Sequence, residues 1–206
     1  MSIWPLAFPL AAGISLLGPL VATGFYELAK RRESGMDSSW FHFLDVFKSR
    51  SRDEIAMVGA VLIGIFALWL AAAGMVYTAF FGEMIRQPSF SVFVREVFTT
   101  PQGWMMIVVG NLIGLGFAVS VLALSVVSLP MLVDKDVSAG TAIRTSLRAF
   151  RENMGAMIRW GLTVAVLLVL GSIPFFVGLA VVLPVLGYAT WHLYTRLIDR
   201  SGLPPA

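Results

Sequence analysis

The sequence predicts an all-α integral membrane protein, a helical bundle with about five transmembrane helices and two or three amphipathic interfacial helices. One observation is composition: 58% of the 206 residues are hydrophobic and 13% are charged, compared with about 25% charged in an average soluble domain. The other is that four long stretches contain no Asp, Glu, Lys or Arg: residues 1–26, 55–82, 97–133 and 160–195. Each can span a bilayer core about 30 Å thick, which takes roughly 20 apolar residues.

The first three stretches each predict one crossing, and the fourth is long enough for two. Gly171 and Pro174 lie near the middle of the fourth stretch, where Pro removes a backbone donor and Gly relaxes the backbone. We therefore expect a hairpin of two spans there rather than one long tilted helix. Because the spans leave no connection long enough for a separate globular unit, residues 1–206 are expected to form a single transmembrane domain.

Three connecting segments have the apolar spacing of amphipathic helices that lie in the headgroup layer of a membrane. These are residues 39–47, 89–98 and 138–154. Their apolar faces consist of Trp40, Phe43, Leu44 and Phe47 in the first, Phe90, Phe93, Val94, Val97 and Phe98 in the second, and Ile143, Leu147, Phe150 and Met154 in the third.

A basic stripe runs beside the third apolar face. It consists of Arg144, Arg148 and Arg151. One interpretation is that the amphipathic helices only seat the bundle in the interface. The other is that the arginines bind an anionic lipid headgroup or an acidic loop of a partner protein. The contact surface would then also include three aromatic residues of the first segment, Trp40, Phe43 and Phe47.

The distribution of Lys and Arg predicts the orientation of the chain. Residues 30–54 carry six basic side chains, residues 83–103 two, residues 134–159 five, the hairpin turn none, and the C-terminal tail two. Cytoplasmic segments are enriched in Lys and Arg, so the first, third and last of these segments are expected in the cytoplasm. The N-terminus would then lie outside and the C-terminus in the cytoplasm.

Four polar residues in the third stretch are candidates for a function at membrane depth: Asn111, Ser120, Ser125 and Ser128. Such residues can line a polar path, or they can form hydrogen bonds within their own helix or across to a neighbouring helix. No acidic or basic residue lies deep in any stretch. This pattern disfavours an ion-coupled transporter.

A weak internal similarity links the first and last spans. Pro19 is followed after eight residues by Glu27, and Pro184 is followed at the same offset by His192. If the two spans are neighbours, Glu27 and His192 would meet at one depth, where a carboxylate favours the protonated histidine. The alternative is a belt of aromatic residues with interfacial polar anchors.

Several classes of function lack their residues in this sequence. Cysteine is absent and only His42 and His192 are present, so we expect no metal site and no cofactor. The chain contains no catalytic motif that we can recognise, and we expect no enzymatic activity. Basic residues lie beside the membrane ends, which favours anionic lipid headgroups, and not nucleic acid, as their partner.

Several motifs together resemble a bacterial inner-membrane family known as domain of unknown function 2189. They are FPL at 8–10, LGP at 17–19, YELAKRRESG at 26–35, GN at 110–111, SLPMLVD at 128–134 and LPVLGYATWHLY at 183–194. The resemblance implies a bacterial inner-membrane location and no established activity. Some members are labelled cytochrome c oxidase components, but a catalytic oxidase subunit needs several intramembrane histidines, so the resemblance implies at most an accessory subunit.

We therefore predict a non-catalytic membrane protein, an accessory or scaffolding subunit that associates with lipid and with a membrane complex such as a respiratory one. The alternative is a small-solute transporter or channel with Asn111 and the serines of the third stretch along its path. A third hypothesis, ranked last, is a membrane-embedded enzyme that uses Glu27 and His192 as an acid–base pair.

Overall fold

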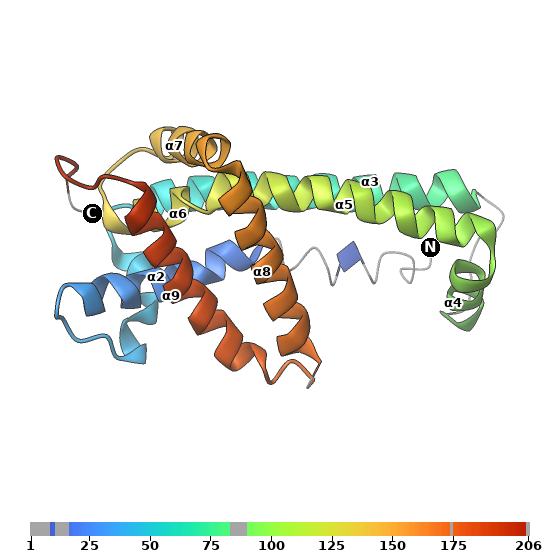
Figure 1. The fold of residues 1–206 in the computed structure, drawn as a ribbon, viewed down its shortest axis with the longest axis horizontal. Helices are drawn as coiled ribbons and strands as arrows, with labels where there is room; N and C mark the ends of the chain where they lie inside the picture. The colour runs from blue at the N-terminus through green and yellow to red at the C-terminus, as the bar shows by residue number, and fades with distance from the viewer. Residues whose placement is uncertain (1–8, 11–16, 83–89, 174, 205–206) are drawn as a thin grey trace. The chain divides into compact units, whose positions relative to one another are not determined.

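The computed structural model describes residues 9–10, 17–82, 90–173 and 175–204, and this part of the chain is helical with no strands (Figure 1). It confirms the predicted all-α class. The helices are α2 (Gly18–Glu33), η2 (Trp40–Lys48), α3 (Arg52–Phe81), α4 (Phe90–Thr99), α5 (Pro101–Ser125), α6 (Ser128–Asp134), α7 (Ala139–Glu152), α8 (Met154–Ser172) and α9 (Leu179–Leu197).

Three helical segments in the described part are long and apolar enough to cross a membrane. They are α3, the run from Pro101 to Asp134 that contains α5 and α6, and α8. The first predicted span falls largely on residues 1–8 and 11–16, which lie outside the described residues. Membrane-spanning helices are thus confirmed, whereas the number of five crossings stays a prediction.

The contacts divide the chain into two compact units. Unit 1 comprises residues 1–17 and 61–121, and unit 2 comprises residues 18–60 and 122–206. Helices α3 and α5 contribute residues to both units. The single domain expected from the sequence stays a prediction, and we describe each unit by itself.

Unit 1 is held together by aromatic packing. The ring of Trp69 on α3 lies against α5, where a Cβ at Gly114 would be 3.0 Å from its Cη2 atom, and its centroid is 5.7 Å from that of Phe117. Its Nε1 donates a hydrogen bond to the Pro9 carbonyl at 2.9 Å. Glycine at position 114 therefore permits the close approach of α3 and α5.

Unit 2 is built around α2, which packs against η2, α6 and α9. Residues 23–29 of α2 are all buried, so this helix has contacts on every side. Two glycines allow these approaches: a Cβ at Gly24 would meet the Phe43 ring of η2, and a Cβ at Gly187 of α9 would meet Phe25. Large residues at these two positions would separate the helices.

The third uncharged stretch is not one continuous helix, although the run from Pro101 to Asp134 is still one candidate membrane span, as the sequence predicts. Helix α5 ends at Ser125 and α6 begins at Ser128. Pro130 lies in the first turn of α6, and a proline inside one continuous helix would clash with the carbonyl four residues earlier. Ser146 of α7 satisfies two backbone groups at this break. Its Oγ accepts a hydrogen bond from Val127 N at 3.2 Å and donates one to Ala123 O at 2.7 Å.

Candidate functional site

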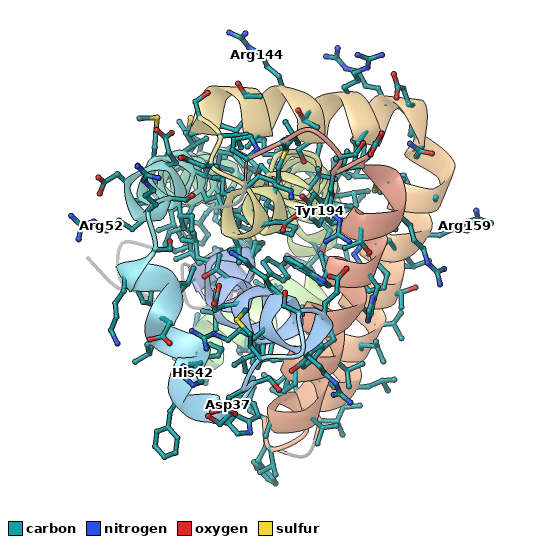
Figure 2. The ribbon with its side chains drawn as sticks, turned by 90° about the vertical axis from the view of Figure 1, so that its left-hand side faces the viewer. Asp37, His42, Arg52, Arg144, Arg159 and Tyr194 are labelled. Atoms are coloured by element: carbon teal, nitrogen blue, oxygen red, sulfur yellow. The ribbon has the colours of Figure 1, made fainter. Side chains whose placement is uncertain are left out.

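A cluster of polar side chains lies where the ends of α2, α6 and α9 meet the C-terminal tail. We call Glu33, Asp134, Trp191, Tyr194 and Arg200 the tail cluster. The Tyr194 hydroxyl donates to Asp134 Oδ2 at 2.9 Å, and Trp191 Nε1 donates to Glu33 Oε2 at 2.9 Å. Arg200 forms an ion pair with Glu33 and lies 3.7 Å from Asp134. Tyr194 points into the interior of this unit (Figure 2).

The opposite charges in the tail cluster stabilise one another. The hydrogen bond from Arg200 lowers the pKa of Glu33, and the same bond raises the pKa of Arg200. Nearby, Lys30 Nζ donates to Val133 O at 2.8 Å, which satisfies a carbonyl at the end of α6. Every member has a partner, so the cluster serves to join four segments and leaves no free group for chemistry. Sequence analysis missed it, because its members are far apart in the chain.

A second cluster joins α2 to η2. Arg31 donates to Glu27 at 2.9 Å and to Asp45 at 3.0 Å. The two ring nitrogens of His42 lie 2.6 Å from Asp45 and 3.2 Å from Asp37, which Figure 2 shows at the edge of the unit. The hydrogen bond from His42 is the main reason that the pKa of Asp45 falls to about 2. We call these residues the η2 cluster.

The hypothesis that Glu27 pairs with His192 is not reproduced by the structure. The expected neighbourhood of the two helices is present, because α2 packs against α9. The Glu27 carboxylate, however, is bound by Arg31, one turn away on its own helix and permanently charged. The carboxylate whose pKa His192 helps to lower is that of Glu33.

The segment at 39–47 is helical, but it is a 3-10 helix and not the α-helix that the spacing predicted. Because a 3-10 helix repeats every three residues, the expected single apolar stripe is divided into two rows. Trp40, Phe43 and Val46 form one row, in which Phe43 packs edge-on against Phe25 at 4.9 Å and Val46 is buried. The other row is exposed and consists of Phe41, Leu44 and Phe47.

The predicted amphipathic helix with the basic stripe is present as α7. Ser138 caps its N-terminus by accepting from Thr141 N, and Glu54 accepts from Ala139 N at 2.6 Å. Its buried face differs from the expected one: Ile143 and Leu147 are half-buried and Met154 is exposed. Small residues allow this face to pack closely, and it contains Ala139, Ala142, Ser146, Ala149 and Phe150.

The three arginines lie together along α7, as predicted. Arg144, Arg148 and Arg151 line a cavity of about 440 Å³ with Leu147 and Glu152. Arg148 is neutralised by Glu152 at 2.8 Å, whereas Arg144 and Arg151 have no ion pair among the described residues. Arg144 projects away from the ribbon (Figure 2). The face therefore presents two uncompensated positive charges next to an apolar side chain.

A second cavity of about 450 Å³ lies between α8 and α9. It is lined by Trp160, Ala189, His192, Leu193 and Arg196. Arg196 likewise has no ion pair among the described residues, and most of the remaining lining is apolar.

Three of the four polar residues of the third stretch donate hydrogen bonds to carbonyls one turn earlier in the chain. Asn111 Nδ2 donates to Ile107 O at 2.7 Å, and the Ser120 hydroxyl donates to Gly116 O at 2.8 Å. Ser128 Oγ donates to Leu124 O across the break at 2.5 Å, and Ser125 is buried. None of these residues lines either of the two cavities above. Among the residues that the structure describes, no group of three His, Asp or Glu side chains could hold a metal ion.

The comparison with protein families decides the family of the chain. A family described as "Predicted integral membrane protein (DUF2189)" matches residues 7–134, more than half of the sequence. The chain belongs to the DUF2189 family. No curated protein and no solved structure matches this DUF2189 chain. The match includes α2 to α6 with Glu33 and Asp134, whereas α7, α8 and α9 lie beyond its C-terminal limit.

Proposed function

We propose that this DUF2189 chain is a non-catalytic accessory or scaffolding subunit of the bacterial inner membrane, which binds anionic lipid and a partner complex through α7. The observation that carries the proposal is the pair of uncompensated charges Arg144 and Arg151 beside the α7 cavity. Arg guanidinium groups match phosphate and carboxylate oxygens, and anionic lipids attract basic segments at the cytoplasmic surface. Lipid headgroups or an acidic loop of a partner would complete this face.

The proposed orientation follows the charge distribution. The basic segments 30–54 and 134–159 lie in the cytoplasm, and the hairpin of α8 and α9 returns to the side from which it starts. The exposed row of η2, formed by Phe41, Leu44 and Phe47, then supplies apolar contact area beside the headgroups. In this arrangement the C-terminal tail is cytoplasmic.

Native extraction tests the proposal. We would release the protein at its own expression level with a membrane-solubilising polymer and analyse the particles by native electrophoresis and mass spectrometry. Co-migration with a defined membrane complex, together with anionic phospholipid, is the expected result. Migration of the protein as a monomer or a homo-oligomer would contradict the accessory role and would favour the alternative of a solute transporter or channel.

A charge-matched pair of variants isolates α7. Arg144→Gln with Arg151→Gln should lose most of the retained anionic lipid and the partner. Arg32→Gln with Arg50→Gln removes the same charge from two exposed residues that also lack ion pairs in the described chain, and it should retain both. Equal losses in the two double variants would contradict a specific α7 surface and leave only a net-charge effect.

A further inference from the structure

Helix α8 as a whole is long and apolar enough to cross a membrane, but the uncharged part of each arm of the α8–α9 hairpin is shorter than a bilayer core. In α8 the uncharged part begins after Arg159 and runs over residues 160–172, which at about 1.5 Å per residue is about 20 Å. In α9 it runs over residues 179–195, up to Arg196, which is about 25 Å. A bilayer core is about 30 Å thick. Helix α3 is uncharged from Ile55 to Phe81, about 40 Å, which is longer than either arm of the hairpin.

The tip of the hairpin is apolar and exposed. Ile173, Phe175, Phe176 and Val177 expose 70%, 93%, 68% and 72% of their surface. No Asp, Glu, Lys or Arg occurs between Trp160 and Thr195. A turn that emerges into water on the far side of a membrane is expected to expose polar or charged side chains, whereas a turn in hydrocarbon is expected to expose apolar ones.

The turn also satisfies most of its own backbone groups. Phe175 N donates to Ile173 O at 2.9 Å, Phe176 N to Ser172 O at 3.1 Å, and Leu179 N to Phe176 O at 3.0 Å. The Ser172 hydroxyl donates to Leu168 O at 2.7 Å. Backbone groups in hydrocarbon have no water to pair with and must be satisfied internally.

Backbone geometry closes this turn tightly. Phe175 and Phe176 have positive φ angles of 48° and 65°, a left-handed conformation that is rare for bulky residues. Beneath them the two arms touch at glycines, since a Cβ at Gly178 would lie 2.7 Å from Gly171 O. The strained turn and the glycine contact bring the arms together within a few residues and leave the phenylalanine rings outside.

The charged side chains that flank the hairpin, and its histidine, lie at the other end. Arg159, Trp160, His192 and Arg196 surround or adjoin the cavity at the base, while α8 and α9 meet at the turn (Figure 1). Trp and Arg are residues that favour the membrane interface. Both arms therefore change from interfacial to uncharged in the same direction, toward the tip.

We propose that α8 and α9 form a re-entrant hairpin, which enters the bilayer from the cytoplasmic side and ends among the lipid acyl chains, with Phe175 and Phe176 at its tip. The hairpin then contributes no crossing, which departs from the two spans expected from the sequence. Both arrangements leave Arg159 and Arg196 on the same side, so the positive-inside rule is satisfied equally. The inference rests on membrane insertion alone and does not depend on the proposed accessory role.

Cysteine accessibility provides the first test, because the chain contains no cysteine. Phe175→Cys and Val177→Cys would be expressed singly and treated with a membrane-impermeant maleimide in intact cells and in inverted membrane vesicles. Gln102→Cys and Gly140→Cys, at exposed positions, serve as controls for the outer and the cytoplasmic side. The tip variants should label from neither side and label fully after denaturation. Labelling of the tip from outside, at the rate of Gln102→Cys, would overturn the proposal.

Depth measurement separates a tip in the acyl chains from one in the far headgroup layer. A spin label on the same cysteines, in lipid bilayers of defined composition, reports depth from the ratio of its relaxation by oxygen and by a water-soluble nickel complex. We expect a position well inside the hydrocarbon. A label at the outer headgroup depth would mean that the hairpin crosses, and would refute the inference. Val177 does not have the positive φ angle of Phe175 and Phe176, so Val177→Cys remains informative if Phe175→Cys does not fold.

Discussion

The two units of the chain differ in what holds them together. Unit 2 carries every Lys and Arg except Arg86 and Arg95, and every Asp and Glu except Glu83 and Glu96. Its segments are joined by side-chain hydrogen bonds over long sequence separations, as in the tail cluster. The described part of unit 1 is joined instead by ring packing around Trp69, with polar groups such as Asn111 bonded within their own helix.

This difference matches the composition of the units, because unit 2 contains most of the charged side chains, although it also contains the apolar helix α8. Helices in hydrocarbon satisfy their backbone internally and associate by close packing at small residues. Segments at the membrane surface compete with water, so their relative positions need specific partners such as Arg200 with Glu33. We therefore expect the stability of unit 2 to fall when single polar side chains are removed, and the stability of unit 1 to fall when side-chain volume is changed at a helix contact.

The largest effect is expected in the tail cluster. Asp134→Ala removes the acceptor of the buried Tyr194 hydroxyl and one carboxylate facing Arg200. An unsatisfied buried polar group costs about 1–3 kcal/mol, so unfolding of unit 2 should become easier by that amount. Hydrogen exchange measured by mass spectrometry in lipid nanodiscs should show faster exchange in α6 and α9. Asp136→Ala, at an exposed position, is the control; an equal response would show that the cluster does not hold the tail.

A smaller effect is expected from volume in unit 1. Gly114→Ala places a methyl group 3.0 Å from the Trp69 ring, and the strain should cost about 1 kcal/mol. Gly110→Ala, one turn earlier with open space around it, should be neutral or stabilise by up to about 1 kcal/mol through helix propensity. Thermal unfolding in detergent compares the two. If the variants were equal, the α3–α5 contact would not depend on glycine.

The η2 cluster should respond to acid. Its Asp45 carboxyl has a pKa lowered from 3.8 to about 2, with the His42 hydrogen bond as the main cause. A lowered pKa means that the stabilisation is complete above about pH 4 and is lost as the pH falls from about 4 to about 2. Carboxyl ¹³C chemical shifts should show this midpoint, and His42→Asn should raise it. A midpoint near 3.8 in the parent chain would contradict the cluster.

The smallest effect is expected on the surface of α7. Arg148 and Glu152 form an i,i+4 ion pair with highly exposed side chains. Such pairs contribute about 0.3–0.5 kcal/mol, so Arg148→Gln should leave the melting temperature nearly unchanged. The same measurement on Asp134→Ala provides the contrast between an exposed and a buried polar contact. A large loss in Arg148→Gln would indicate that α7 is less exposed in the membrane than by itself.

The sequence by itself determined the features that depend on local composition and period. Uncharged stretches predicted the long apolar helices, and the arginine spacing predicted the basic face of α7. It could not distinguish a period of 3.6 from one of 3.0 in WFHFLDVFK, because six of its nine residues are apolar and occur in positions compatible with either period. The packing of Phe43 against Phe25 of α2 and the burial of Val46 fit the 3-10 form of η2.

Partner choice was decided only by the tertiary structure. From the sequence, Glu27 could pair either with Arg31, one turn away, or with His192 in the last span. In the structure it pairs with Arg31. Glu33 and Arg200, separated by 167 positions, meet because α2 packs against α9. Hydrophobic burial can be predicted from residue type, because it needs no particular partner. A hydrogen bond depends on the distance and direction between two specific atoms, and these are set only once the helices have packed.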